Sequence, residues 1–445
     1  MRDKSQTPAT PTLLEASKYW LKLGFVSFGG PAGQIAIMHQ DLVENKRWIS
    51  EQRFLHALNY CMVLPGPEAQ QLATYIGWLM HRTWGGVIAG ALFVLPSLFI
   101  LMVLSWVYLR YGNLPVITSV LDGIKPAVVA IVLFAAYRIG SRALKNKWLW
   151  AISLLAFIAV AVFKIAFPWV VLSAAFIAHI VAKYQPQIFS QSNSHRSKQV
   201  NYGVAIIDDD TPTPAHAMYQ HRKVIKVLLI GLVIWLLAIG LLFVVFGWQH
   251  MLTQMAWFFS KAAMLTFGGA YAVLPYVFQG SVEYYSWLTA PQMMDGLALG
   301  ETTPGPLIMI VAFVGFVGGW SGLALGVNSA LLSGVVAASI VTLFTFLPSF
   351  IFIFAGAPFV ESTKNNLNLT APLIGITAAV VGVIVSLALF FAQHIFMSAS
   401  QINWLAIAGT ILALFALIKL KLSIIKLVFI FAMLGLIKHF VVMYI

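Results

Sequence analysis

Long apolar segments dominate the sequence, and they constrain its fold more than any other feature. They cover residues 85–109, 116–136, 149–163, 166–182, 224–247, 306–332, 333–356, 371–396, 402–418 and 422–442. A bilayer core offers no water to backbone polar groups, so segments of this length cross it as helices. Shorter, interrupted apolar stretches lie at 18–39, 54–80, 253–278 and 293–303. We therefore predict an all-α polytopic membrane protein with about 10–13 membrane segments, some of them broken or re-entrant.

Composition excludes the other broad classes of protein. Sixty per cent of the 445 residues are apolar and 9% are charged, whereas soluble domains average about 25% charged. The net charge of +13 lies in loops, where Lys and Arg indicate membrane orientation rather than nucleic-acid binding. Cys61 is the one cysteine, which rules out an internal disulfide and a cysteine metal cluster. We expect no cofactor, no metal and no nucleic acid, and a lipid bilayer as the surroundings.

The sequence contains one domain twice. Ser27-Phe28-Gly29-Gly30 recurs as Thr266-Phe267-Gly268-Gly269, and Pro65-Gly66-Pro67 recurs in the same register as Pro304-Gly305-Pro306. After an insertion, Leu95-Pro96-Ser97 matches Leu347-Pro348-Ser349. We predict a first repeat at 1–182, a polar linker at 183–223, an unpaired transmembrane helix at 224–247 and a second repeat at 248–445. The linker composition is typical of a disordered segment.

Loop charge predicts that the two repeats are inverted relative to each other. Loops 41–53 and 138–147 are basic, whereas their counterparts 280–292 and 390–399 contain no Lys or Arg. A third pair reverses this bias, since Lys164 stands alone where the second repeat has three lysines, Lys419, Lys421 and Lys426. Basic loops face the cytoplasm, so the N-terminus and linker are predicted to be cytoplasmic and the C-terminus periplasmic. Inverted repeats are common in secondary transporters.

Both duplicated motifs break helices at membrane depth. Glycine and proline remove side chains and a backbone donor, and such breaks are tolerated where protein buries them or where they line a wet cavity. Half-helix N-termini then direct free N–H groups and a positive dipole end inward, which favours an anion. We predict that the substrate is a small anion. The alternative is that the glycines allow close helix crossing and the prolines merely kink.

These motifs, together with Trp48 and Phe54, resemble the signature of the chromate ion transporter family in its long, two-domain form. The resemblance covers nearly the whole chain and is least diagnostic in the linker and beyond about residue 400. It implies a carrier in the bacterial inner membrane that exports chromate and confers chromate resistance. The second copy departs from the pattern, with Ala270 in the position of Pro31, so the halves are expected to contribute unequally.

Several further side chains are candidates for the substrate site. Lys22 and Lys261 occupy equivalent positions two helical turns before the glycines, although they could instead extend to the interface. Lys125 could present a cation to the substrate or neutralise Asp122. Four side chains flank the breaks and could donate hydrogen bonds to the anion: Gln70, Gln71, Thr302 and Thr303. Glu68 and Glu301 could bind a coupling proton, and neither is duplicated.

Energetics favour export over uptake. Moving one charge across 100 mV is worth about 2.3 kcal/mol, so a leaving dianion gains about 4.6 kcal/mol per 100 mV. Membrane potential or proton motive force is therefore sufficient. A carrier of sulfate or another oxyanion remains the first alternative, and a membrane-embedded enzyme or a passive channel fits the sequence less well. Coupling to protons and assembly as a homodimer are left open.

Overall fold

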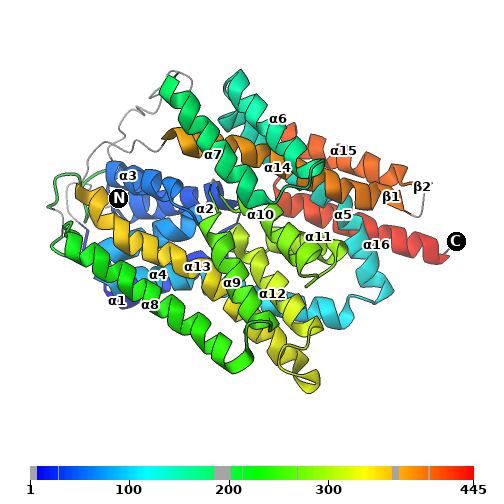
Figure 1. Ribbon diagram of the computed structural model, residues 1–445, viewed down its shortest axis with the longest axis horizontal. Coiled ribbons are helices and arrows are strands. Elements are labelled where there is room, and N and C mark those ends of the chain that lie inside the picture. The colour runs from blue at the N-terminus through cyan, green and yellow to red at the C-terminus, as the bar shows by residue number, and fades with distance from the viewer. Residues whose placement is uncertain are drawn as a thin grey trace.

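The computed structural model describes residues 8–28, 30–184, 202–212, 214–267, 269–362, 370–398 and 401–444, which form a bundle of helices (Figure 1). Seven described helices are long and apolar enough to cross a membrane, and three shorter apolar helices accompany them. Among these residues, the strands form one short hairpin of β1 (Met397–Ser398) and β2 (Gln401–Ile402), and one isolated bridge joins Ile49 to Ile207. The prediction of an all-α polytopic membrane protein is confirmed.

The first copy of the domain begins with a capped helix and ends before the linker. Thr12 and Glu15 form a reciprocal capping box at the first helix, which satisfies backbone donors that a helix start leaves free. His81 and Arg82 are non-helical, so the longest helix consists of two segments joined at a bend. The elements are α1 (Leu13–Val26), α2 (Gly30–His39), the π-helix η1 (Gln40–Asn45), α3 (Glu51–Val63), α4 (Glu68–Tyr111), α5 (Pro115–Ala143), α6 (Lys147–Ala161) and α7 (Phe167–Tyr184).

The second copy follows α8 (His221–Phe246) and repeats the same order of elements. Its 3-10 turn and two helices η4, α12 and α13 stand where the first copy has the bent α4. The elements are α9 (Met251–Met264), α10 (Ala270–Phe278), the π-helix η3 (Gln279–Tyr284), α11 (Ala290–Thr302), η4 (Leu307–Met309), α12 (Ile310–Ser321), η5 (Val327–Ser329), α13 (Ala330–Ser362), α14 (Thr370–Phe396), α15 (Trp404–Ile418) and α16 (Ile424–Tyr444).

Unusual backbone geometry recurs at equivalent residues of the two copies. Each has a π-helix in the same place, η1 and η3. Arg47 and Ser286 both have φ of 52°. The Trp48 amide donates to the Leu42 carbonyl at 2.7 Å, and the Trp287 amide donates to Ser281 at 2.8 Å. Two unrelated segments would not share these conformations, so the copies have the same local fold.

The copies pack against each other reciprocally. Helix α5 contacts α15 and α16, while its counterpart α14 contacts α6 and α7. Gly123 of α5 lies against Gly435, where an added Cβ would be 2.6 Å from that residue's Cα. The matching Gly375 of α14 lies against α7, and its added Cβ would be 2.4 Å from Ala178 Cβ. Such reciprocity is typical of elements related by an approximate two-fold axis.

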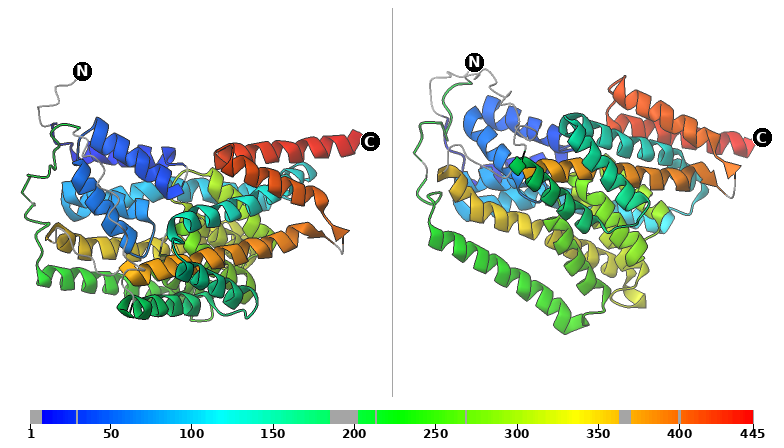
Figure 2. Two further views of the ribbon diagram at one scale, coloured as in Figure 1. Left: turned by 90° about the horizontal axis from the view of Figure 1, so that it is seen from above. Right: turned by 45° about the horizontal axis from the view of Figure 1, so that its top comes forward.

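The copies begin at opposite ends of α8. Near the start of α1, His81 Nε2 donates to the Pro11 carbonyl, and His216 of the linker that leads into α8 contacts the same bend through Trp78. Near the start of α9, just after α8 ends, His250 Nε2 donates to the Ala324 carbonyl. The 26 residues of α8 extend over about 39 Å. Helix α8 lies along the outside of the bundle (Figure 2).

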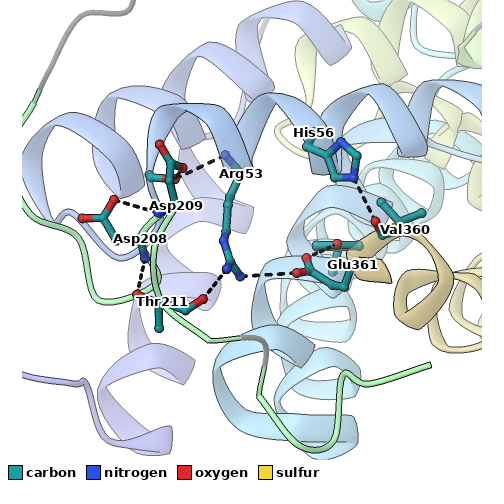
Figure 3. Close-up of polar contacts among 9 residues, drawn as sticks. Arg53, His56, Asp208, Asp209, Thr211, Val360 and Glu361 are labelled. Carbon is teal, nitrogen blue, oxygen red and sulfur yellow. Dashed lines mark hydrogen bonds and ion pairs between the residues drawn. The ribbon is translucent and has the colours of Figure 1, made fainter. Parts of the chain in front are cut away.

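The linker packs on the molecule over part of its length (Figure 3). Ile207 forms a parallel bridge with Ile49, and Ser50 Oγ donates to Asp209. Arg53 donates to the Thr211 carbonyl and forms an ion pair with Glu361 at the end of α13. The prediction of a disordered linker is therefore wrong for residues 202–212 and 214–220, because backbone pairing and a shared arginine hold this segment against α3.

Candidate functional site

The centre of the molecule is a reciprocal crossing of the two duplicated motifs. The Gly66 amide donates to the Thr266 carbonyl at 2.7 Å, and the Gly305 amide donates to the Ser27 carbonyl at 2.7 Å. The Pro-Gly-Pro turn of each copy thus pairs with the helix break of the other. The structure brings together motifs that lie far apart in the sequence, as expected for a site shared by both copies.

Glycine is required at both turns. Gly66 has φ of +130° and Gly305 has φ of +99°, a region that side chains strongly disfavour. A Cβ on Gly66 would lie 2.3 Å from Ser349 Oγ, and one on Gly305 would lie 2.7 Å from Ser97 Cβ. The two serines are themselves equivalent residues of the repeated Leu-Pro-Ser motif. Backbone and hydroxyl groups therefore converge where no side chain fits between them.

Polar atoms without partners surround this crossing. Gln34 is buried and its amide nitrogen donates to the carbonyls of Gly305 and Ser27, while its oxygen has no partner. Seven buried side-chain oxygens lack a hydrogen bond within the described part of the chain, and five of them belong to residues of this region: Ser27 Oγ, Gln34 Oε1, Gln70 Oε1, Gln71 Oε1 and Ser97 Oγ. Unsatisfied buried polar groups are costly. Their concentration here indicates a place for water or a polar ligand.

The helix breaks themselves leave unfilled space. Gly30 at the start of α2 has φ of +71°, and Gly269 before α10 has φ of +97°. A Cβ on Gly269 would meet no described atom within 4 Å, and one on Gly30 would meet only Arg138 Nη2, 3.9 Å away. An ion could therefore approach the backbone at both breaks. Gly29 and Gly268, which the sequence also singles out, lie outside the described residues.

Arg138 of α5 connects the two breaks. Its guanidinium lies over the ring of Tyr271, with 5.9 Å from Cζ to the ring centroid. Tyr271 is in α10, and its hydroxyl donates to Glu301 at the end of α11. Glu301 and Arg138 interact electrostatically. A cation, a phenol and a carboxylate from both copies thus meet beside Gly30.

The remaining predicted residues lie in several places. Gln71 Nε2 donates to the Pro65 carbonyl at 2.8 Å, so Gln71 flanks the crossing, whereas Gln70 Nε2 donates to Thr74 Oγ1 of its own helix at 3.0 Å. The hydroxyls of Thr302 and Thr303 donate to carbonyls of their own helix. The same duplicated motifs also contain the predicted residues Phe28, Phe267, Pro67, Pro304 and Pro306. Glu68 is the first residue of α4.

The three predicted lysines have two kinds of surroundings in the structure. Lys22 and Lys261 are exposed, and Lys261 lies over the ring of Trp257 at 5.6 Å. Lys125 forms an ion pair of 2.6 Å with Asp122. These placements match the interfacial and charge-neutralising alternatives that the sequence left open for them.

Two hollows mark equivalent places at the far ends of α2 and α10. One, of about 320 Å³, is lined in part by Pro275, Phe278, Gln279 and Glu283. The other, of about 480 Å³, is lined in part by the four equivalent residues Ala36, His39, Gln40 and Glu44. Each of these short helices therefore runs from a glycine break to a hollow, over about 15 Å.

The sequence did not reveal Arg138, Tyr271, Gln34 or the paired serines as site residues. Arg138 was grouped with a basic loop at 138–147, but residues up to Ala143 belong to α5, so that part of the expectation is wrong. For Ser97 and Ser349 a signal existed, since their Leu-Pro-Ser motif is duplicated. For Arg138 and Tyr271 none did, because their contact joins the two copies.

Comparison with known proteins agrees with this architecture. The chain is 30% identical over 389 residues to a chromate transport protein of Cupriavidus metallidurans, covering 87% of this chain and 84% of that one. It is 32% identical over 375 residues to a chromate transport protein of Pseudomonas aeruginosa, covering 84% and 80%. An uncharacterised transporter of Bacillus subtilis is 26% identical over 162 residues, which cover 36% of this chain and 91% of that one. No solved structure matches.

The chromate transporter profile matches two separate regions, residues 14–179 and 253–436. Each region corresponds to one copy of the domain, and the linker and the whole of α8 lie between them. The relatives are named as transport proteins, which indicates a transporter rather than an enzyme. This chain is a multi-pass membrane protein, and it belongs to the chromate transporter family.

Proposed function

We propose that this protein is a secondary transporter that exports chromate across the bacterial inner membrane and thereby confers chromate resistance. The observation that carries the proposal is the reciprocal crossing at Gly66–Thr266 and Gly305–Ser27, in a chain that belongs to the chromate transporter family. The crossing brings backbone groups and unpartnered hydroxyls together, and the helix breaks beside it leave open space at Gly30 and Gly269, which suits a small oxyanion better than a bulky or apolar substrate.

The proposed substrate site combines the four duplicated motifs with the polar groups around them. It contains Ser27 to Gly30, Thr266 to Gly269, the two Pro-Gly-Pro turns, Gln70, Gln71, Thr302 and Thr303. Glu68 and Glu301 are proposed as candidates for binding a coupling proton. Lys22 and Lys261 are left at the outer surface, where exposed ammonium groups sit favourably at a membrane interface.

We propose that the two copies are inverted in the membrane, with the domain division predicted from the sequence. Helix α8 is strongly apolar and mostly exposed, as expected for a helix that faces lipid and crosses once. Since the copies begin at its opposite ends, they would begin on opposite sides of the membrane. The N-terminus, the linker and the basic loop 41–53 would then be cytoplasmic, the C-terminus periplasmic, and one hollow would open on each side.

Export is the direction that membrane potential favours. With the interior negative, a leaving dianion gains about 4.6 kcal/mol per 100 mV, which corresponds to more than about three decades of concentration gradient. Export then needs no further energy source, although exchange for an entering proton would add to the driving force.

Sulfate is the second candidate substrate. The side-chain groups at the crossing are hydroxyls and carboxamides, which would respond to the tetrahedral shape and charge that chromate and sulfate share. Discrimination between the two anions must therefore be measured directly.

The test uses inside-out vesicles that contain the full-length protein and no internal substrate. In these vesicles export appears as uptake, so labelled chromate should accumulate when an interior-positive potential is imposed. Vesicles without the protein are the control, and excess sulfate measures selectivity. Failure of chromate to accumulate, with sulfate accumulating instead, would replace chromate by sulfate as the substrate. Accumulation of neither anion would contradict the proposed function.

A further inference from the structure

We infer that Arg138 is the residue that binds the transported oxyanion, and that the Glu301 carboxylate competes with the anion for it. This inference rests on the proposed function and deepens it by assigning a charged group to the substrate. Neither the duplicated motifs nor the predicted lysines supply that charge.

The position of Arg138 suits this role. Its Nη2 atom is the nearest group to the space that Gly30 leaves open, 3.9 Å from where a Cβ would be. The ring of Tyr271 faces the guanidinium, with its centroid 5.9 Å from Arg138 Cζ. Within the described part of the chain, no protein oxygen accepts a hydrogen bond from it. Its planar fork of donors is therefore available to bind two oxygens of a tetrahedral anion.

Two other cations of the bundle already have carboxylate partners, and two lysines are exposed. Lys125 is paired with Asp122 at 2.6 Å, and Arg53 is paired with Glu361 at 3.3 Å. Lys22 and Lys261 are exposed on the outer surface. Arg138 is half-buried beside both helix breaks, where an opposite charge is less screened than at the surface.

The charged and polar residues of the site occur once in the chain, whereas the glycine motifs around them occur in both copies. Arg138, Tyr271 and Glu301 have Phe390, Ala32 and Met62 as their equivalents in the other copy. The duplicated glycines thus leave open space at equivalent positions of the two copies, and three unduplicated residues from both copies add charged and polar groups beside it. A single dianion bound per molecule is the stoichiometry that this arrangement implies.

Competition follows from the contacts of Glu301. Its carboxylate accepts a hydrogen bond from the hydroxyl of Tyr271, whose ring faces the Arg138 guanidinium, so it is the acidic group near the guanidinium when no substrate is bound. An arriving dianion would become the closer counter-charge of the guanidinium and would be repelled by the Glu301 carboxylate. No covalent step is involved.

The experiment measures equilibrium binding of labelled chromate, with sulfate in a parallel arm, to the purified full-length protein. Four variants are compared with the wild type in buffer at about pH 8, above the ordinary titration range of a carboxyl group. These are Arg138→Gln, Arg138→Lys, Glu301→Gln and, as a matched control, Arg142→Gln. Arg142 lies one turn further along α5 and is exposed. Thermal melting of each variant monitors the fold.

We expect opposite effects at the two residues. Arg138→Gln should weaken anion binding by about 10-fold or more, because a hydrogen-bonded charge is lost. Arg138→Lys should recover part of the affinity, whereas Glu301→Gln should tighten binding several-fold because the competitor is removed. Arg142→Gln should bind as the wild type does.

A purely structural ion pair would give a different pattern, in which Arg138→Gln and Glu301→Gln both weaken binding and both lower the melting temperature. That pattern, or wild-type affinity in Arg138→Gln, would overturn the inference while wild-type chromate binding leaves the proposed function intact. If the wild type binds neither anion, the proposed function fails and this inference falls with it.

Discussion

The backbone amide of Gly66 donates a 2.7 Å hydrogen bond to the carbonyl of Thr266, which joins a turn of the first copy to the helix break of the second. Its equivalent, Gly305 to Ser27, has the same length. Each copy therefore supplies the partner that the other copy's exposed turn needs. The two halves are interdependent at this point, and the predictions below begin there.

Substitution of Gly66 by alanine should destabilise the protein. The new Cβ would overlap Ser349 Oγ, and a φ of +130° costs a non-glycine residue on the order of 1–3 kcal/mol. The measurement is thermal unfolding of the detergent-purified protein. Gly240→Ala in α8 is the matched control, because its Cβ would meet nothing within 4 Å and alanine favours helices. Equal melting temperatures for the two variants would contradict the described packing at Gly66.

Alanine at Gly269 should impair transport more than stability. Gly269 and Gly247 have similar φ angles, +97° and +81°, and neither Cβ would meet a described atom within 4 Å. Backbone strain should therefore destabilise both variants by a similar amount, on the order of 1–2 kcal/mol. Only Gly269→Ala places a methyl group in the proposed anion space. Chromate uptake into inside-out vesicles should fall in Gly269→Ala and persist in Gly247→Ala, and equal transport would place the anion elsewhere.

Inverted topology predicts opposite labelling of two equivalent positions. Asn45 and Tyr284 are both exposed at the ends of their π-helices. Asn45→Cys should react with a membrane-impermeant maleimide from the cytoplasmic side, and Tyr284→Cys from the periplasmic side. The native Cys61 is fully buried, so the wild type serves as the unlabelled control. Reaction of both cysteines from one side would show that the copies are parallel.

Loss of the Arg53 side chain should make the linker more accessible to proteases. Loss of its guanidinium removes the bonds to Glu361 and to the Thr211 carbonyl, and it leaves Glu361, which is only 8% exposed, without its cationic partner. Arg53→Gln should therefore accelerate proteolysis within the linker several-fold, corresponding to about 1 kcal/mol or more. Arg222→Gln, at an exposed position of α8, should leave the rate unchanged. Unaltered cleavage in Arg53→Gln would mean that other contacts hold the segment.

Linker packing should also weaken at acidic pH. Burial lowers the pKa of His216 from its ordinary value of 6.5, and Arg82 and Lys223 act in the same direction. The packed state therefore favours the neutral imidazole, so packing is stabilised above about pH 6.5 and weakened progressively below it. Linker proteolysis should be faster at about pH 5.5 than at about pH 7.5. His216→Asn should reduce this dependence, and an unchanged pH profile in that variant would assign the effect to another group.

Sequence patterns were sufficient for the helices and for the motifs that cross at the centre. Apolar length identified α8 and α14 because membrane helices must satisfy their backbones internally. The shared register of Gly66 and Gly305 indicated equivalent roles, and both residues donate an equivalent hydrogen bond to the other copy. In both cases the determining interactions are local or repeated, so a pattern in the sequence indicates them.

No sequence pattern indicated the contacts between the copies. The position of Arg138 beside Tyr271 depends on how α5 and α10 pack, and neither helix encodes its partner. The same limit applies to the linker, whose polar composition predicts disorder although Ile207 pairs with Ile49. Tertiary packing overrides local preference at these positions, and a single sequence offers no measure of it.

Helix α8 has a consequence for how such proteins can be encoded. It has no counterpart in either copy, and only 11% of its most apolar window is buried in the bundle, so it adds little to the packing. The Bacillus subtilis relative aligns over 162 residues, which are 91% of its own length, so a related chain of about one repeat's length exists. In the proposed topology, two half-length genes could be fused into one only with a crossing helix at the junction, because without it the second half would insert the wrong way round.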